Sequence, residues 1–251
     1  MADTPHADAP GPREPVFWAL IPAAGIGRRM GADCPKQFLT LGSRTILSHT
    51  LSIFLEHPRI RGVVLVLGPD VDPDALDLPL AGGRLFRVAG GAERADSVQN
   101  GLDFLAERAR PEDWVLVHDA ARPCLPAEDL ECLLDSLGDD PVGGLLAAPS
   151  TDTIKWSDPA GRVERTLDRQ RIWRALTPQM FRLGALRDAN AAARRAGHPV
   201  TDEASAIEFS GARPRLVEGS SMNIKITRSE DLELARLYLM KQGRLDGAFH
   251  P

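Results

Sequence analysis

The stretch ALIPAAGIGRRM, Ala19 to Met30, and the CPKQF at residues 34–38 decide the fold. The apolar residues before Pro22 are typical of a buried strand. The small residues from Pro22 to Gly27 let the backbone close around a phosphate chain, so that free N–H groups can point at it. Two arginines and Lys36 then supply positive charge at the same place. The pattern predicts a nucleoside triphosphate held over the end of a strand.

Two commoner glycine motifs fit this stretch poorly. A P-loop needs Gly-Lys-Ser/Thr after its glycines, whereas Gly27 is followed by Arg28 and Arg29. A dinucleotide fingerprint needs a third glycine three residues after Gly27, where this chain has Met30. A plain strand-to-helix turn is the remaining alternative, and the arginine pair and the Pro-Lys-Gln sequence argue against it.

Lysines are rare in this chain, which uses arginine for most of its positive charge. Of the 30 basic residues only four are lysines, namely Lys36, Lys155, Lys225 and Lys241. A lysine inside a motif is therefore expected to act as a compact point charge. Lys36 lies in CPKQF and Lys225 in NIKIT, whereas Lys241 near the polar tail is interpreted as solvated.

Composition limits the class of protein. The 251 residues are enough for one large α/β domain or two small ones. No segment approaches a membrane span, and the formal net charge of −5 gives no indication of a nucleic-acid surface. Three cysteines (Cys34, Cys124 and Cys132) are too few and wrongly spaced for a disulfide framework or a zinc site, which favours a reduced, cytoplasmic setting.

Apolar runs alternate with amphipathic stretches along the chain. Strands are predicted at Phe17–Ile21, Val63–Leu67, Leu85–Val88, Trp114–His118, Gly144–Ala147, Leu216–Val217 and Asn223–Thr227. Helices are predicted around Ile46–Phe54, Val98–Leu105 and Leu130–Leu137, and from a capping box at Thr227–Glu230 to about Met240. The alternation predicts an α/β fold, Rossmann-like, with a mostly parallel sheet and helices on both faces. Ligands of such sheets bind beyond the carboxyl ends of the strands.

One segment interrupts this alternation. Thr153–Trp156 and Arg162–Leu167 are short, polar and β-like, and the turn residues Asp158–Gly161 join them into a hairpin. An isolated hairpin is marginal in water, so this one is expected to pack on something, a second subunit being one candidate. The alternative is a floppy surface excursion. The whole chain is divided into a disordered leader at 1–15, a single domain at 16–240 with a β-arm at about 150–172, and a flexible tail at 241–251.

Three further motifs carry polar residues next to predicted strand or helix ends. In HDAARP, Asp119 follows a predicted strand and can help to hold Mg²⁺ or orient a phosphate ligand, with capping or loop stabilisation as the alternative. His118 is interpreted as a packed or hydrogen-bonded histidine and not as a catalyst. GGAERADSV repeats the small-residue pattern and ends near Ser97, and TDEASA places Thr201 and Asp202 at a helix start, where capping is the simpler interpretation.

Taken in order, the motifs PAAGIGRRM, CPKQF, GGAERADSV, HDAARPC, DRQRIWRALTPQ, TDEASA and NIKIT resemble those of one family, the 2-C-methyl-D-erythritol 4-phosphate cytidylyltransferases of the non-mevalonate isoprenoid pathway. The resemblance covers about Val16 to Leu239. The ribitol-5-phosphate cytidylyltransferases are similar but favour HDSVRP and TDAC at the corresponding motifs. The pattern of Arg169 and Trp173 also favours the methylerythritol family.

The resemblance implies transfer of a cytidylyl group from CTP to a polyol phosphate, with Mg²⁺ held mainly by the CTP phosphates and Asp119 as a possible ligand. It implies a homodimer formed through the β-arm. The implied catalytic residues are Arg29, Lys36 and Lys225. The implied CTP-binding residues are Pro22, Ala23, Ala24, Gly25, Gly27, Gly91, Ser97, Asp119 and Ala120. The implied residues around the second substrate are Asp119, Arg122, Thr153, Arg169, Thr177 and Thr201, with Arg169 reaching the partner's site.

One residue departs from the family pattern, and two other classes of function remain. Ala92 stands where a polar residue, often Asp, is expected, so a base contact made by that side chain would be missing. A non-catalytic nucleotide sensor is disfavoured by the presence of both Lys36 and Lys225. A dinucleotide-dependent oxidoreductase is disfavoured by the missing glycine and by the lack of an acidic residue after Leu67.

Overall fold

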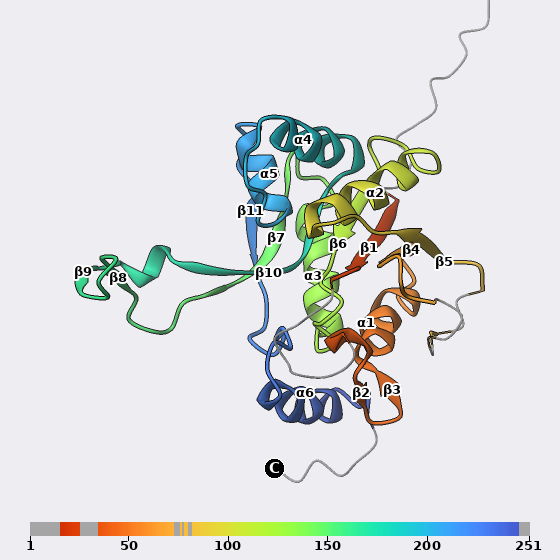
Figure 1. Ribbon diagram of the computed structural model, residues 1–251, viewed down its shortest axis with the longest axis horizontal. Coiled ribbons are helices and arrows are strands. Elements are labelled where there is room, and N and C mark those ends of the chain that lie inside the picture. Colours follow the sequence, from red (N-terminus) through yellow and green to blue (C-terminus); the bar gives the residue numbers. More distant parts are fainter. Residues whose placement is uncertain (1–15, 26–34, 73–75, 77, 80–81, 246–251) are drawn as a thin grey trace, which may run out of the picture.

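The structure is a computed structural model that describes residues 16–25, 35–72, 76, 78–79 and 82–245. Within these residues the main sheet has seven strands in the order β11-β7-β10-β6-β1-β4-β5 (Figure 1). The strands are β1 (Phe17–Ala23), β4 (Ile60–Leu67), β5 (Leu85–Ala89), β6 (Trp114–Val117), β7 (Gly143–Pro149), β10 (Trp173–Arg182) and β11 (Arg215–Glu218). Within this sheet β10 runs antiparallel to β6 and β7, and the other pairs are parallel. The predicted mostly parallel sheet is confirmed.

Helices cover both faces of the sheet, as the alternation predicted. The helices of one face are α1 (Ile46–Leu55) and α3 (Ala127–Leu137), and those of the other are α2 (Arg94–Ala106), α4 (Leu183–Arg195) and α5 (Glu203–Phe209). Along β1, Ala19 and Ile21 join the core on the α1 side, whereas Trp18 and Leu20 join the core on the α2 side. This alternation follows from strand geometry, because successive side chains point to opposite faces.

The last helix, α6 (Glu230–Lys241), packs against a third apolar cluster, separate from the two on the faces of the main sheet. The buried members of this cluster are Leu41, Ile46, Cys124, Ile226, Ala235 and Leu239. Near it lies a small hairpin of β2 (Thr40–Leu41) and β3 (Arg44–Thr45) (Figure 1). The helix begins where predicted, but its capping carboxylate is Asp231 and not Glu230. One oxygen of Asp231 accepts the N–H groups of Thr227 and Arg228 at 2.7 and 2.8 Å.

Two sequence predictions about strands need correction. Asn223–Thr227 is not a strand, because the segment runs along the loop after β6, where the Ile226 N–H donates to the Ala121 carbonyl at 2.9 Å. The second correction concerns β10, a strand that the sequence pattern did not predict. Pro178 interrupts its apolar pattern, and its pairing with β7 shifts register between Ala175 and Gln179.

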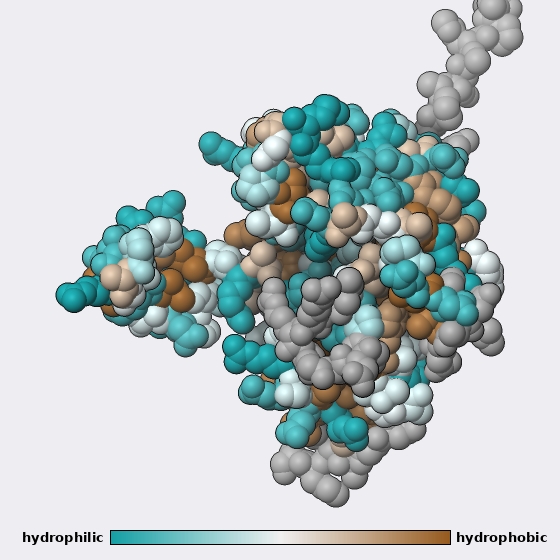
Figure 2. Space-filling model, viewed as in Figure 1, coloured by the Kyte–Doolittle hydropathy of each residue, from teal (hydrophilic) through white to brown (hydrophobic). Residues whose placement is uncertain are grey.

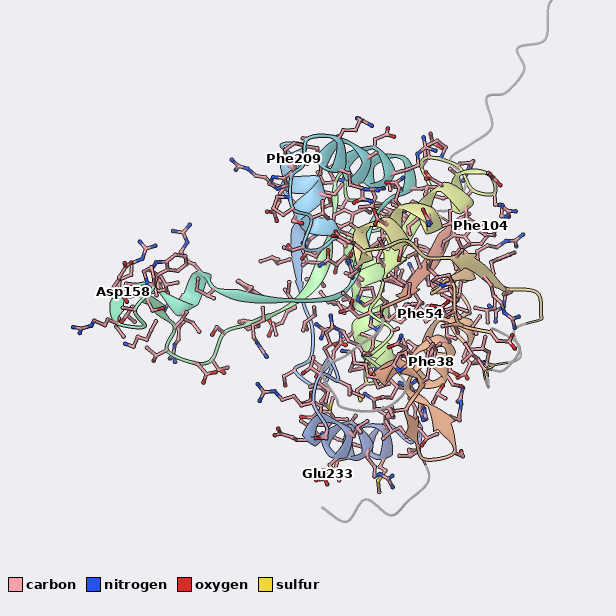
Figure 3. The ribbon with its side chains drawn as sticks, viewed as in Figure 1. Phe38, Phe54, Phe104, Asp158, Phe209 and Glu233 are labelled. Carbon is pink, nitrogen blue, oxygen red and sulfur yellow. The ribbon has the colours of Figure 1, made fainter. Side chains whose placement is uncertain are left out.

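The predicted hairpin is present as an arm that protrudes from the rest of the molecule (Figure 1). Its strands are β8 (Lys155–Ser157) and β9 (Val163–Thr166), which pair antiparallel. Asp158 lies at the far end of the arm (Figure 3). Its backbone carbonyl accepts the Gly161 N–H at 3.0 Å. Trp156 is 52% and Val163 62% exposed, and apolar residues are visible on the surface of the arm (Figure 2).

Some predictions concern residues that the structure does not describe. Gly27, Arg29 and the leader at 1–15 lie outside the described residues, as does the part of the tail from residue 246 onward. Within the described ranges, no helix combines the length and the apolar character that crossing a bilayer requires.

Candidate functional site

A cleft with a volume of about 210 Å³ lies beyond the carboxyl ends of β1, β5 and β6. This is the edge at which a parallel sheet is expected to bind its ligand. The predicted site residues that line it are Pro22, Ala23, Ala24, Gly25, Lys36, Gly91, Ser97, Asp119, Ala120 and Lys225. The cleft lining also includes Ala92, so the departure from the family pattern lies where it could affect a bound ligand.

The loop after β1 is held by Gln37, a residue that was not predicted from the sequence to belong to the site. Its side-chain amide donates to the carbonyl oxygens of Ala23 and Gly25, both at 2.9 Å. Gln37 is buried, in a 3-10 turn formed by Lys36–Phe38. Because both carbonyls are turned toward Gln37, the start of the loop has a fixed shape before any ligand arrives.

The loop between β5 and α2 approaches the first loop closely. A Cβ atom on Gly90 would lie 2.4 Å from the Cβ of Ala24, so no larger residue fits there without a shift. The Ser97 hydroxyl accepts the Gly91 N–H at 3.1 Å and donates to the Glu93 carbonyl at 3.1 Å. Ser97 therefore shapes this wall of the cleft from within, at the start of α2.

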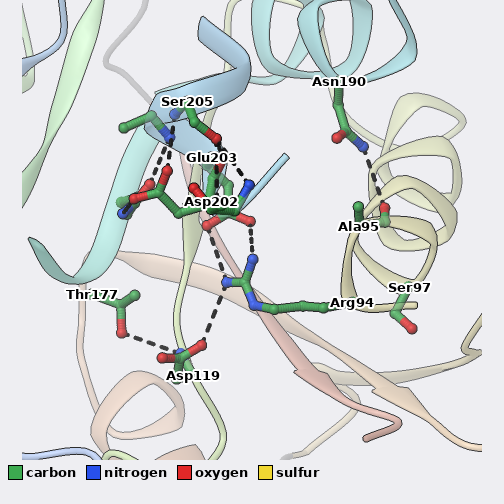
Figure 4. Close-up of polar contacts among 12 residues, drawn as sticks. Arg94, Ala95, Ser97, Asp119, Thr177, Asn190, Asp202, Glu203 and Ser205 are labelled. Carbon is green, nitrogen blue, oxygen red and sulfur yellow. Dashed lines mark hydrogen bonds and ion pairs between the residues drawn. The ribbon is translucent and has the colours of Figure 1, made fainter. Parts of the chain in front are cut away.

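Asp119 is the centre of a cluster of charges. Its Oδ2 atom lies 3.0 Å from the Lys225 ammonium and 3.3 Å from Arg122 Nε. Its Oδ1 atom lies 3.4 Å from Arg94 Nη2 (Figure 4). Burial disfavours the ionised carboxylate, but the charges of Arg94, Lys225 and Arg122 outweigh that effect and hold the pKa of Asp119 well below its ordinary value. Asp119 is therefore an anion that orients cations.

Arg94 and Glu203 form a second ion pair beside this cluster. Arg94 Nη1 lies 2.7 Å from Glu203 Oε1, and Nη2 lies 3.1 Å from Oε2 (Figure 4). Burial opposes the charged guanidinium, yet the charges of Glu203 and Asp119 raise the pKa of Arg94 above its ordinary value. Both residues lie in motifs quoted above, GGAERADSV and TDEASA. The sequence could not pair them because they belong to different helices.

Thr177 and His118 link the backbone around Asp119. The Thr177 hydroxyl accepts the Asp119 N–H at 3.2 Å and lies 3.0 Å from His118 Nδ1. His118 Nε2 lies 3.0 Å from the Arg122 carbonyl, so Nε2 carries the proton and Nδ1 accepts from Thr177. Burial lowers the pKa of His118 to about 4. His118 is buried and hydrogen-bonded, as predicted, and its lowered pKa makes it neutral at pH 7.

The remaining predicted residues that the structure describes do not line the cleft. Arg122 is nearly buried, and its Nη1 donates to the Asn223 carbonyl at 2.7 Å. Thr201 is exposed just before α5, whose start is capped by Asp202, as the TDEASA pattern predicted. Thr153 and Arg169 belong to the arm, and this one chain does not bring them to the described cleft.

The cleft offers few ligands for a metal ion. Among the described residues no group of three or more His, Cys, Asp and Glu side chains is arranged to hold one. The carboxylates in the described lining are Glu93 and Asp119, and both oxygens of Asp119 already face cations. These residues alone do not fit a closed protein site for a divalent cation.

Comparisons with known proteins agree on one family. The sequence profile for 2-C-methyl-D-erythritol 4-phosphate cytidylyltransferase matches residues 17–241. Over 232 residues the chain is 58% identical to the 2-C-methyl-D-erythritol 4-phosphate cytidylyltransferase of Pseudomonas savastanoi pv. phaseolicola, covering 92% of this chain and 98% of the relative. The enzyme of the same name from Pseudomonas putida strain W619 is 58% identical over 224 residues, which are 88% and 95% of the two chains.

Solved structures carry the same name. The Francisella tularensis 2-C-methyl-D-erythritol 4-phosphate cytidylyltransferase matches with a TM-score of 0.75 and 37% identity, covering 89% of this chain and 100% of that chain. The structure from Thermus thermophilus matches with a TM-score of 0.70 and 32% identity, over 87% of this chain and 96% of that one.

Proposed function

The chain belongs to the 2-C-methyl-D-erythritol 4-phosphate cytidylyltransferase family, and from this premise we propose how its cleft performs the reaction. The enzyme transfers the cytidylyl group of CTP to 2-C-methyl-D-erythritol 4-phosphate, a step of isoprenoid precursor biosynthesis. The observation that carries the proposal is the meeting of small-residue loops with Lys36 and Lys225 in one cleft. Small-residue loops suit a nucleotide, and two lysines suit its phosphates.

The reaction needs no general base. An oxygen of the substrate phosphate is already an anionic nucleophile, and it attacks the α-phosphorus of CTP in line. A new P–O bond forms, the bond to the β-phosphate oxygen breaks, and pyrophosphate leaves with that electron pair. The cost lies in bringing two anions together, so catalysis rests on positioning and on charge neutralisation.

The two lysines supply that charge from different parts of the chain. Lys36 follows the loop after β1, and Lys225 lies in the segment before α6. Asp119 holds the Lys225 ammonium at 3.0 Å before ligands arrive, so the ammonium needs little rearrangement to meet the α-phosphate. Arg29, outside the described residues, is proposed to add charge at the triphosphate.

The residues proposed to hold CTP are Pro22–Gly25, Gly91 and Ser97. The β1 and β5 loops are close together at Gly90, which leaves a small pocket suited to a pyrimidine. Ala120 is also proposed to contact CTP. The residues proposed to contact the polyol phosphate are Asp119, Arg122, Thr177 and Thr201.

A divalent cation, proposed as Mg²⁺, is expected to arrive on the phosphates of CTP. The family is compatible with divalent cation use, and the described residues do not build a closed metal site of their own. When bound, the ion neutralises phosphate charge. Asp119 would become a ligand only by exchanging one of its cationic neighbours for the ion.

We also propose a homodimer joined through the β8–β9 arm. The arm exposes Trp156 and Val163, large apolar side chains that a second subunit could cover. Arg169 lies three residues after the end of β9, at the start of a 3-10 turn. We propose that an arm laid on a second subunit brings Arg169 and Thr153 to that subunit's polyol phosphate. The free thiols of Cys124 and Cys132 support a reduced, cytoplasmic setting.

The experiment that tests the function compares substrates. Pyrophosphate release is measured with each of the four nucleoside triphosphates, combined with methylerythritol phosphate or with ribitol 5-phosphate. The proposal expects turnover with CTP and methylerythritol phosphate. A clear preference for ribitol 5-phosphate would favour the second candidate, a ribitol-5-phosphate cytidylyltransferase. CTP binding without turnover would favour a nucleotide sensor.

A further inference from the structure

Glu203 is a buried carboxylate that forms an ion pair with Arg94. Its side chain is 3% exposed, and Arg94 meets both of its oxygens. A buried charge is costly unless it is paired and hydrogen-bonded, so the pairing dictates where Glu203 sits. Glu203 opens α5 and Arg94 opens α2, and the pair therefore joins two helices on the same face of the sheet.

The bidentate ion pair with Glu203 also fixes the plane of the Arg94 guanidinium. With Nη1 and Nη2 each on one oxygen of Glu203, Nη2 is left 3.4 Å from Asp119 Oδ1 (Figure 4). The planar fork of arginine keeps this geometry in a way that a lysine ammonium cannot. Arg94 is one of the lining residues of the cleft, so its orientation matters inside the site.

Asp119 then divides its two oxygens between different partners. Oδ1 faces Arg94, whereas Oδ2 faces Lys225 at 3.0 Å and Arg122 at 3.3 Å. The side chain of Lys225 is 41% exposed, and a long exposed ammonium has many orientations unless an anion holds it. With Oδ1 occupied by Arg94, Oδ2 is the oxygen that faces Lys225 and Arg122.

We propose that Glu203 is a positioning residue for cytidylyl transfer: it holds Arg94 against Asp119 Oδ1, and thereby keeps Asp119 Oδ2 for Lys225. The inference deepens the proposed function and rests on it. Without the Glu203 charge, the Arg94 guanidinium forms a bidentate ion pair with Asp119. Asp119 Oδ2 then contacts Arg94 in place of Lys225. The Lys225 ammonium then loses its preset orientation, although CTP keeps its other contacts.

The test replaces the carboxylate by an amide of the same shape. Glu203→Gln is expected to lower kcat about tenfold, less than the roughly hundredfold loss that a misplacement of a full ångström can cause, while KM for CTP stays within about threefold. Glu208→Gln is the matched control, because Glu208 is exposed on the same helix. Glu203→Asp keeps the charge but is one methylene shorter, and it is expected to retain more kcat than Glu203→Gln.

A double-mutant cycle separates positioning from a merely structural role. If Glu203 acts through Asp119 and Lys225, the effect of Glu203→Gln on kcat disappears in a Lys225→Ala background. Titration calorimetry of CTP and the melting temperature are recorded for each variant. A loss of melting temperature with unchanged kcat would mean that the pair only joins α2 to α5, and would overturn the inference.

The other outcomes are equally decisive. An equal fold-loss of kcat in the wild-type and Lys225→Ala backgrounds would also overturn the inference, because Glu203 would then act elsewhere. A wild-type protein inactive with CTP and methylerythritol phosphate would overturn the proposed function and this inference with it. An active wild type with an unaffected Glu203→Gln variant overturns the inference alone.

Discussion

The Lys36 ammonium donates a hydrogen bond of 2.7 Å to the backbone carbonyl of Ile226, the residue that follows Lys225. The two lysines of the cleft, 189 positions apart by their residue numbers, are therefore held by one short segment. Ile226 is itself fixed, since its N–H donates to Ala121 and its side chain lies in the apolar cluster under α6.

This arrangement predicts that Lys36→Ala and Lys225→Ala each reduce turnover more than CTP affinity, because the negative charge on the phosphates is most crowded in the transition state. The loss of one preorganised charge is expected to lower kcat about a hundredfold. Lys→Arg variants should fail as well, since a planar fork does not replace a point charge. Steady-state kinetics with CTP titrations test this, and near-wild-type kcat in either alanine variant would remove that lysine from the mechanism.

Gln37 is predicted to control CTP binding through the shape of the first loop. In Gln37→Glu the side chain no longer donates to the Ala23 and Gly25 carbonyls, and it repels them. KM for CTP is expected to rise about tenfold, in line with two lost hydrogen bonds. Gln242→Glu is the matched control, because the Gln242 amide also donates to a carbonyl, that of Cys124, but lies outside the cleft lining. Equal KM values for the two variants would contradict the prediction.

Arg169 tests the proposed dimer. In the single chain its Nη1 donates to the Thr151 carbonyl at 2.8 Å, on the arm. Arg169→Ala is expected to weaken binding of methylerythritol phosphate and to leave CTP binding unchanged. Mixing it with Lys36→Ala should restore activity, because one site of each mixed dimer has both residues intact. Random mixing gives about half mixed dimers, so recovery should approach roughly a quarter of wild-type sites.

The control for that experiment is subunit exchange, confirmed by mass spectrometry. If exchange takes place and activity does not return, Arg169 acts within its own chain or outside the site.

His118 predicts how stability depends on pH. Its pKa falls from 6.5 to about 4 on burial, so between these pH values the unfolded chain binds more protons than the folded one. The free energy of unfolding should therefore fall as pH drops from about 6.5 toward 4, by about 3 kcal/mol at most. The lowered pKa of His49 acts in the same direction, whereas the lowered pKa of Asp119 acts only at more acidic pH.

The His118 share is isolated by comparison with a variant. His118→Asn is expected to be less stable at neutral pH but to lose less further stability on acidification, as measured by urea unfolding at pH 7, 6, 5 and 4. Parallel curves for the two proteins would show that His118 is not the titrating group.

The sheet was largely predictable because its strands are local apolar runs. β1 and β6 could be found from Phe17–Ile21 and Trp114–His118, since parallel strands covered on both faces are apolar throughout. The failures have local causes too. β10 was missed because Pro178 interrupts its apolar pattern. Asn223–Thr227 was predicted as a strand because its residues alternate between polar and apolar, whereas in the structure Ile226 packs in the apolar cluster beside α6.

The lining of the cleft was predictable where a short motif contains both small residues and cations. Gly91 and Lys36 could be found from short motifs, because a phosphate-binding loop needs small residues and cations close together. The contacts of Gln37 and the Arg94–Glu203 pair could not be found that way. They depend on which elements the tertiary fold brings together, and a single sequence does not encode that pairing as a local pattern.

The central claim is the transfer of the α-phosphorus of CTP with release of pyrophosphate, and it is tested most directly by following a label. CTP labelled at the α-phosphorus is incubated with methylerythritol phosphate, and the products are separated and identified by mass spectrometry. We predict that the label appears in 4-diphosphocytidyl-2-C-methyl-D-erythritol, with one pyrophosphate released per product. Unlabelled product, or release of inorganic phosphate in place of pyrophosphate, would contradict the account.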